Sequence, residues 1–204
     1  MTRGPQTLRN YHGIMLFCPE HAALLEIEED LGQPVSSFEA SGGHVTRLDL
    51  SCDLKALRYS LPGARRQLET IPASLGNLSS LQSLGFINNL LASLPDSIGN
   101  LHSLLRLNLN KNRLTSLPET LGSLASLQSL AVECNQLASL PESLGNLSSL
   151  QFLGLMDNYL TSLPESIGSL ECLQFLNIEH NQLASLPATL GNLSSLEVLL
   201  LNDN

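Results

Sequence analysis

Leucine recurs in this chain at a spacing of 23 residues, and this spacing constrains the fold more than any other feature. Each leucine of the series begins one unit, L-x-x-L-x-L-x-x-N-x-L-x-x-L-P-x-x-L-G-x-L-x-x, which is clearest in residues 104–126 and 150–172. A unit this short cannot bury its apolar face alone, so successive units must stack into a solenoid. The leucines that begin the units are Leu81, Leu104, Leu127, Leu150, Leu173 and Leu196.

Each part of the unit predicts its own local structure. The x-L-x-L-x segment alternates apolar and polar residues, which predicts a short strand with its leucines turned inward. The asparagine that follows is expected to bond backbone groups of its own coil and of the neighbouring coil. The Leu-Pro pair suits the start of a short helical turn that the glycine then ends. A core of many small layers also fits the composition, because aromatic residues make up only 4% of the chain.

The unit resembles the 23-residue L-x-x-L-P type of leucine-rich repeat, and the resemblance covers residues 45–204. Within this type it is similar to the intracellular Ras-suppressor and scribble-like group and its prokaryotic relatives. The resemblance implies an α/β fold, a right-handed solenoid or horseshoe with a parallel concave sheet, short helical turns on the convex side and an N-terminal capping helix. It also implies a protein partner on the concave face, in intracellular signalling or assembly, and sometimes a small GTPase.

The residues before the repeats are predicted to form an N-terminal cap over residues 1–44. An amphipathic helix is expected at about residues 19–31, with its apolar side chains on one face and the acids at 28–30 turned outward. Leucine-rich repeats are expected to fill the rest of the chain, residues 45–204.

The first repeat is irregular, and an insert is predicted at about residues 55–67. This insert has two interpretations: a basic loop that grips an acidic partner, or a tolerated surface insertion. Five full repeats are expected at residues 81–195 and a partial repeat at residues 196–204. The basic residues of the insert are Lys55, Arg58, Arg65 and Arg66.

The charge distribution argues against nucleic acid as a partner. The net charge is -9, and all ten lysines and arginines lie in residues 1–113, whereas residues 114–204 hold acids and no base. Such an acidic field repels phosphates. The four cysteines form no C-x-x-C pair, and no apolar run is long enough for a signal peptide or a membrane span. We therefore expect a cytoplasmic protein that binds neither nucleic acid nor membranes.

The outward positions of the predicted strands vary between repeats, whereas the convex positions are nearly constant. Phe152, Phe175 and Val198 fall in one column, and exposed aromatic residues often anchor protein partners. Acids surround this column, which predicts a partner with an apolar anchor and basic flanks. Alternatively, the two phenylalanines lean on neighbouring coils as lateral packing. The predicted partner-binding residues are Phe152, Phe175, Val198, Met156, Glu133, Asp157, Glu179, His180, Arg106 and Lys111.

Catalytic interpretations of the chain are weak. Cys134 and His180 share the concave face but lie two coils apart, roughly 10 Å at the ~4.8 Å spacing of strands. That separation exceeds the hydrogen-bond reach between a nucleophile and its base. The sequence contains no phosphate-binding loop and no cluster of metal ligands. We therefore expect no enzymatic activity, cofactor or metal site.

Two other functions stay open. The chain could be the recognition half of a larger enzyme or receptor whose catalytic domain lies beyond Asn204. It could also be a scaffold that self-associates, because the last repeat stops at its ninth position and leaves Leu199 and Leu201 without a following coil.

Overall fold

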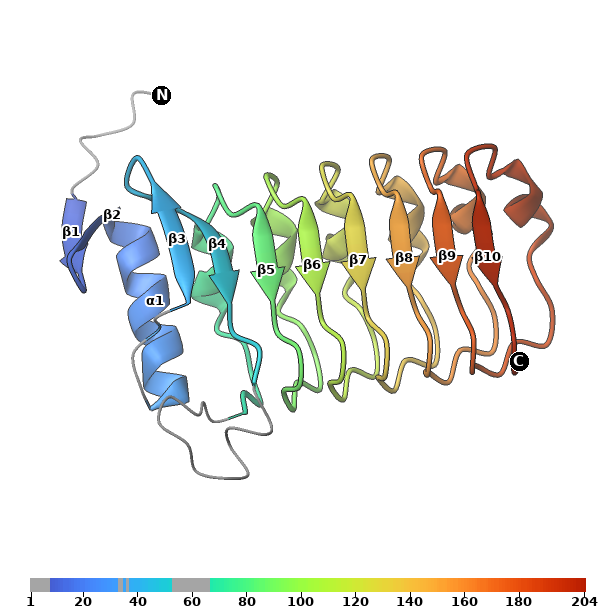
Figure 1. Cartoon of the computed structure of the whole chain (residues 1–204), viewed down its shortest axis with the longest axis horizontal. Coiled ribbons are helices and arrows are strands. Elements are labelled where there is room, and N and C mark those ends of the chain that lie inside the picture. The colour runs from blue at the N-terminus through green and yellow to red at the C-terminus, as the bar shows by residue number, and fades with distance from the viewer. Residues whose placement is uncertain (1–7, 33–34, 36, 53–66) are drawn as a thin grey trace.

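The polypeptide winds as a solenoid in which each coil adds one short strand to a single sheet (Figure 1). The computed structural model describes residues 8–32, 35, 37–52 and 67–204. The sheet has eight strands in the order β10-β9-β8-β7-β6-β5-β4-β3, and all neighbouring pairs from β4 to β10 are parallel. These strands are β4 (His44–Asp49), β5 (Ser83–Gly85), β6 (Arg106–Asn108), β7 (Ser129–Ala131), β8 (Phe152–Gly154), β9 (Phe175–Asn177) and β10 (Val198–Leu200).

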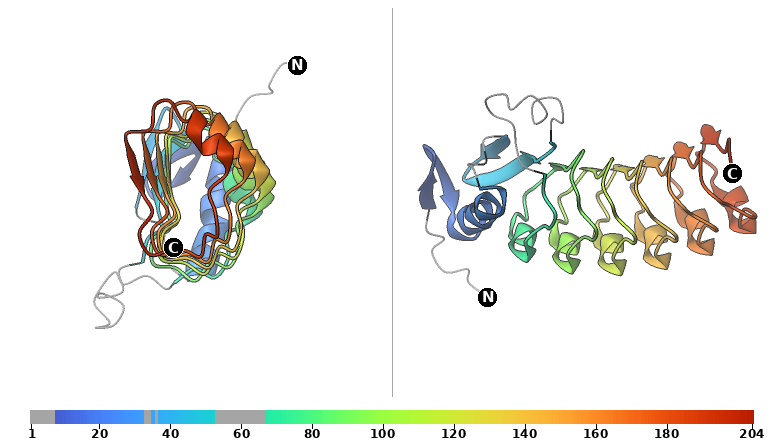
Figure 2. Two further views of the ribbon diagram at one scale, coloured as in Figure 1. Left: turned by 90° about the vertical axis from the view of Figure 1, so that its right-hand side faces the viewer. Right: turned by 90° about the horizontal axis from the view of Figure 1, so that it is seen from below.

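Short 3-10 helices lie on the side of each coil opposite to the sheet. Seen along the solenoid axis, the coils nearly superimpose, with the strands on one side and the helices on the other (Figure 2). The predicted fold class, an α/β leucine-rich-repeat solenoid with short helical turns on the convex side, is therefore confirmed. The 3-10 helices are η1 (Ala73–Asn77), η2 (Asp96–Asn100), η3 (Glu119–Ser123), η4 (Glu142–Asn146), η5 (Glu165–Ser169) and η6 (Ala188–Asn192).

The core is a stack of nearly identical leucine layers. In the coil that contains β6, the seven leucines of the unit are all buried, and burial of each stabilises the fold by roughly 1.5 to 3 kcal/mol. This layer is covered on both sides by the layers of the neighbouring coils, as the solenoid interpretation requires. The leucines of this coil are Leu104, Leu107, Leu109, Leu114, Leu117, Leu121 and Leu124.

The repeated asparagine forms a ladder of hydrogen bonds through the core, as predicted. The side-chain amide of Asn112 donates to the carbonyl of Phe86 in the preceding coil (2.8 Å) and to that of Leu109 in its own coil (2.9 Å). Its side-chain oxygen accepts the backbone N–H of Leu91 (3.1 Å). The other asparagines at this position make equivalent bonds and are Asn89, Asn135, Asn158, Asn181 and Asn204.

Two details of the predicted helical turn were wrong. Pro95 is the residue before η2 and not its first residue, and its carbonyl accepts the backbone N–H of Ile98 (3.0 Å). Gly99 lies inside η2 and does not end it. A Cβ atom at Gly99 would lie 2.6 Å from the carbonyl oxygen of Thr120, so the glycine is needed for close contact between coils.

The N-terminal cap contains more than the predicted helix. Helix α1 (Cys18–Leu31) follows an antiparallel hairpin of β1 (Leu8–Tyr11) and β2 (Ile14–Phe17). Strand β3 (Phe38–Ser41) pairs antiparallel with β4 and extends the sheet beyond the parallel strands. Sequence analysis predicted none of these three strands.

Side chains of α1 also tie the cap to its surroundings. Glu20, only 2% exposed, accepts the backbone N–H of Val45 (2.8 Å) and bonds His44 Nδ1 (3.0 Å). Glu28 was predicted to point outward, but its carboxylate instead accepts the backbone N–H of Val35 (2.7 Å). The insert predicted at residues 55–67 lies, apart from Gln67, outside the described residues.

No helix in the described part of the chain is long and apolar enough to cross a membrane.

Candidate functional site

The register of the strands arranges the outward side chains of the sheet into rows that run along the solenoid. One row contains four of the predicted partner-binding residues, and we call it the anchor row. It consists of Arg47, Ser83, Arg106, Ser129, Phe152, Phe175 and Val198. Beside it runs a second row of smaller side chains, Asp49, Gly85, Asn108, Ala131, Gly154, Asn177 and Leu200.

Phe152 and Phe175 form a stacked pair in the anchor row. Their ring centroids lie 4.9 Å apart, the ring planes differ by 7°, and both side chains are half-buried. Val198 continues the row on β10 and is 39% exposed. The rings therefore do pack laterally, as the alternative interpretation proposed, but on each other. Because they stay partly open to solvent, they leave an apolar surface that spans two strands.

The second row leaves room for this pair. A Cβ atom at Gly154 would lie 3.1 Å from a ring carbon of Phe152 and 2.7 Å from a carboxylate oxygen of Glu133. The absence of a side chain at Gly154 thus lets both Phe152 and Glu133 lie close to the sheet. Met156 follows on the same coil and is half-buried.

The predicted acids are held by side chains of neighbouring coils. Glu133 accepts the amide N–H of Asn110 (2.9 Å), and Asn110 in turn accepts the backbone N–H of Glu133 (2.7 Å). Glu179 accepts a hydrogen bond from the amide of Asn202. These bonds fix the carboxylates near the phenylalanine pair, where they give this part of the face a negative charge.

The chain leaves the sheet through residues with a left-handed backbone. A positive φ is uncommon outside glycine and is best tolerated by Asn, Asp and His, which fill four of these six positions. The shared conformation places Lys111, Asp157 and His180 at one edge of the sheet. Sequence analysis identified these residues as outward-facing but did not detect their shared backbone geometry. The residues are Asn88, Lys111, Cys134, Asp157, His180 and Asp203.

A catalytic nucleophile and its base would bond each other. Cys134 and His180 instead each bond a different residue. The thiol of Cys134 donates to Asp157 (3.5 Å), and His180 Nδ1 pairs with Asp203 (3.3 Å). Burial, reinforced by the hydrogen bond to Asp157, raises the pKa of the Cys134 thiol, so the reactive thiolate is disfavoured at neutral pH. Among the described residues, no three His, Cys, Asp or Glu side chains gather to hold a metal ion.

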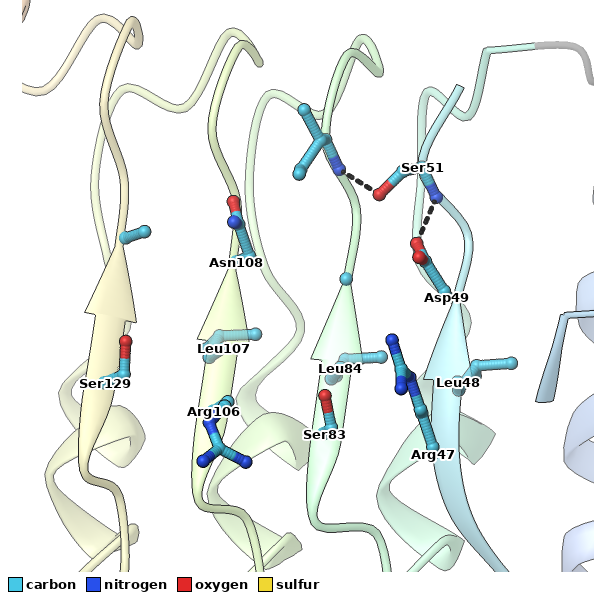
Figure 3. A pocket seen from close by; sticks show the side chains of 13 residues that line it. Arg47, Leu48, Asp49, Ser51, Ser83, Leu84, Arg106, Leu107, Asn108 and Ser129 are labelled. Carbon is cyan, nitrogen blue, oxygen red and sulfur yellow. Dashed lines mark hydrogen bonds between the residues drawn. The ribbon is translucent and has the colours of Figure 1, made fainter. Parts of the chain in front are cut away.

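A hollow of about 230 Å³ lies on the same face, around the other half of the anchor row. Arg47 on β4 and Arg106 on β6 flank Ser83 on β5 (Figure 3). Its floor is made of small residues, including Gly85 and Ala131. Sequence analysis included Arg106 but not Arg47 among the predicted partner-binding residues. The signal was available, because both arginines and the small residues between them occupy equivalent positions of successive repeats.

Comparison with known proteins agrees with the repeat. A family model described as a leucine-rich repeat region matches residues 132–204. No curated protein matches the chain. A leucine-rich-repeat protein of Leptospira interrogans has a similar solved structure, with 28% sequence identity and a TM-score of 0.58, over 90% of this chain and 57% of that one.

Plant receptors are also similar in structure. The Arabidopsis receptor kinase HAESA, solved with the peptide hormone IDA and a co-receptor, has 29% identity and a TM-score of 0.67, over 82% of this chain and 28% of that one. The plant peptide hormone receptor RGFR1, in complex with RGF2, has 36% identity and a TM-score of 0.60, over 66% of this chain and 22% of that one. This chain thus spans between 22% and 57% of the three structures. With its repeat, its solenoid and these matches, the chain is a leucine-rich-repeat protein.

Proposed function

We propose that this protein binds a protein partner on the outward side of its sheet, with the stacked pair of Phe152 and Phe175 as the anchor. The pair carries the proposal, because it keeps an aromatic surface partly open to solvent, and Val198 in the same row extends that apolar surface. Clustered aromatic side chains that lose solvent in a complex supply much of the affinity of typical protein interfaces. The role is one of binding, without catalysis.

The charges around the anchor set the chemistry of the partner. Glu133, Asp157 and Glu179 surround the phenylalanine pair, with His180 at the sheet edge, whereas Arg106 and Lys111 lie on an earlier coil. A partner that places an apolar side chain on the pair therefore needs basic residues beside it. Charge complementarity of this kind raises the rate of association and discriminates against acidic proteins.

The similar receptors support a recognition role for this fold. HAESA and RGFR1 were both solved with bound peptides. Since those chains are much longer than this one, a role as the recognition part of a larger enzyme or receptor is a second proposal. The transcript that encodes Asn204 decides it, because an open reading frame that continues into a kinase, GTPase or ligase domain supports this role and an immediate stop codon contradicts it.

Three finer predictions from the sequence belong to the same proposal. Membership of the Ras-suppressor and scribble-like group, with a small GTPase as partner, still rests on the repeat type alone. A cytoplasmic location is supported by Cys134 and Cys172, which are free thiols in the described part of the chain. Self-association is supported by the exposure of Leu186 (41%) and Leu199 (36%), and light scattering of Leu199→Glu beside wild type tests it.

The central proposal is tested by affinity purification with three versions of the protein. The wild type is compared with the double variant Phe152→Ala, Phe175→Ala and with the control Tyr159→Ala, which removes an aromatic side chain that is 53% exposed. The proposal expects at least one protein that is retained by wild type and control but lost with the double variant, while all three unfold at similar temperatures. If every retained protein is indifferent to the phenylalanine pair, the proposal is wrong.

A further inference from the structure

We infer that the hollow around Arg106 binds an acidic side chain of the same partner segment that places an apolar side chain on the phenylalanine pair. The inference rests on the proposed function and makes it more specific. The partner segment is then an extended peptide with an acidic and an apolar residue four positions apart and basic residues close to the apolar one.

The two arginines of the hollow differ in their existing contacts. Arg47 lies 3.6 Å from Glu39 on β3, in a pair whose side chains are 55% and 68% exposed. An exposed pair of this kind contributes little and is readily replaced. Arg106, in contrast, forms no ion pair with any residue that the structure describes. Arg106 is therefore the cation with most to gain from an incoming carboxylate.

The hollow also contains one carboxylate of its own, on the side of β4. It belongs to Asp49, and it accepts the backbone N–H of Ser51 (3.0 Å) and lies against Gly85 (Figure 3). The hydroxyl groups of Ser83 and Ser129 stand on the same row as the guanidinium groups and can donate to a carboxylate. Bidentate bonds from a guanidinium to a carboxylate are among the stronger and more directional hydrogen bonds in proteins.

The distance between the hollow and the anchor fixes the spacing of the ligand. The hollow is centred between β5 and β6 and the phenylalanine pair between β8 and β9, which is three strand spacings, or about 14 Å at ~4.8 Å each. An extended chain advances about 3.3 Å per residue, so the acidic and apolar residues are about four positions apart. The even number matters, because residues four apart in an extended chain point to the same side.

The row between the two sites is open enough for this path. Ser129 is the single anchor-row residue between Arg106 and Phe152, and its side chain is small. Asp157 and Glu179 lie on the coils of the phenylalanine pair itself, and Asp203 lies on the coil beyond it, so the basic residues of the segment would lie close to the apolar residue. A helical segment would need about nine residues for the same 14 Å, at roughly 1.5 Å per residue.

The inference is tested with a displayed library of random 12-residue peptides selected on the immobilised full chain. We expect enrichment of sequences with an acidic and an apolar residue four positions apart, in either order, and Lys or Arg close to the apolar residue. One selected peptide, synthesised with an amidated C-terminus so that only its side chains carry the carboxylate, is then titrated against wild type and variants. Arg106→Ala is expected to weaken binding about tenfold. The control Arg113→Ala removes an exposed arginine outside the anchor row and should leave affinity nearly unchanged.

A charge exchange provides the sharpest readout. Arg106→Glu should abolish binding of the acidic peptide and restore binding when the acidic residue of the peptide is replaced by lysine. Peptides in which the two residues are three or five positions apart should bind weakly, because one side chain then points away. Peptides that depend on Phe152 and Phe175 but are indifferent to Arg106→Ala overturn the inference and leave the proposed function intact. If the library yields no peptide whose binding depends on the phenylalanine pair, both the inference and the proposed function are contradicted.

Discussion

At the scale of single residues, the asparagine ladder joins the coils most directly. Asn135 donates to the carbonyls of Leu109 and Val132 and accepts the backbone N–H of Leu114, all inside the core. Replacement by alanine leaves the buried backbone N–H of Leu114 without a partner, whereas the two carbonyls each keep a bond from Asn112 or Asn158. A buried unsatisfied group costs about 1 to 3 kcal/mol, so Asn135→Ala should lower the free energy of unfolding by about 1 to 3 kcal/mol.

Urea denaturation measures this change, and the chain offers a matched control. Asn146 is exposed and makes no side-chain hydrogen bond with any described residue. Asn146→Ala should therefore change the free energy of unfolding by less than about 0.5 kcal/mol. Equal losses in the two variants would contradict the structural role of the ladder.

A single acid of the cap makes the stability of the protein depend on pH. Burial alone would raise the pKa of Glu28, but hydrogen bonds from Tyr11, from the backbone N–H of Val35 and from His12 outweigh it and lower that pKa. The unfolded chain then binds the proton more tightly than the folded chain. The stabilisation is present above the pKa of a free glutamate and is lost as the pH falls through the lower pKa of the folded state.

The expected result is a difference in the pH dependence of unfolding. Between pH 6 and about pH 3, the melting temperature of Glu28→Gln should fall less steeply than that of wild type. Glu29→Gln is the control, since Glu29 is an exposed neighbour on the same helix. If the melting temperatures of both variants fall with pH as steeply as that of wild type, Glu28 is not the source of the pH dependence.

At the scale of elements, the glycine of each 3-10 helix sets how closely the coils approach. A Cβ atom at Gly122 would lie 2.4 Å from the carbonyl oxygen of Ser143 in the next coil. This clash can be relieved only if the backbone of one of the two coils moves. Gly122→Ala should therefore destabilise the fold by about 1 to 3 kcal/mol. Gly191, at the same position of η6, has no atom within 4 Å of such a Cβ, and Gly191→Ala should be close to neutral. Chemical denaturation of the two variants, side by side, distinguishes stacking from helix propensity, because propensity alone predicts the same effect at both sites.

The elements that sequence analysis missed occur once in the chain. Repeats can be compared with one another, so the leucine layers, the strands and the asparagine ladder could be predicted from their columns. The hairpins of the cap have no such comparison. In the sequence, each hairpin is marked only by a two-residue turn, His12-Gly13 or Gly42-Gly43. The positive φ angles of these residues suit a tight β-hairpin. The contact role of Gly99 could not be predicted either, because it depends on the distance to the next coil.

At the scale of the whole molecule, the sheet face is divided by charge. Its arginines and lysine lie on the earlier coils, and residues 114–204 carry nine Asp and Glu residues without a lysine or arginine. The sequence predicted this division, but the hollow became evident only when the strand register placed Arg47, Ser83 and Arg106 side by side. A candidate site of this kind depends on neighbouring strands and cannot be derived from one repeat alone.

The charge division predicts how salt affects association. Exposed charges are screened within about 10 Å at 0.1 M salt. The association rate constant of the partner should therefore fall as the salt concentration rises, while the dissociation rate constant, governed by the apolar anchor, changes less. Surface plasmon resonance at several salt concentrations measures both. An association rate that does not depend on salt would contradict a role for the acidic half in attracting the partner.

The most direct test of the account is the affinity of a purified partner for the double variant Phe152→Ala, Phe175→Ala. Calorimetric titration compares this variant with wild type and with Tyr159→Ala, after circular dichroism has established that all three are folded alike. We predict that the double variant binds about 1000-fold more weakly, since two anchoring aromatic residues each contribute about 2 kcal/mol, and that Tyr159→Ala binds like wild type. An unchanged affinity of the double variant would contradict the claim that the stacked pair anchors the partner.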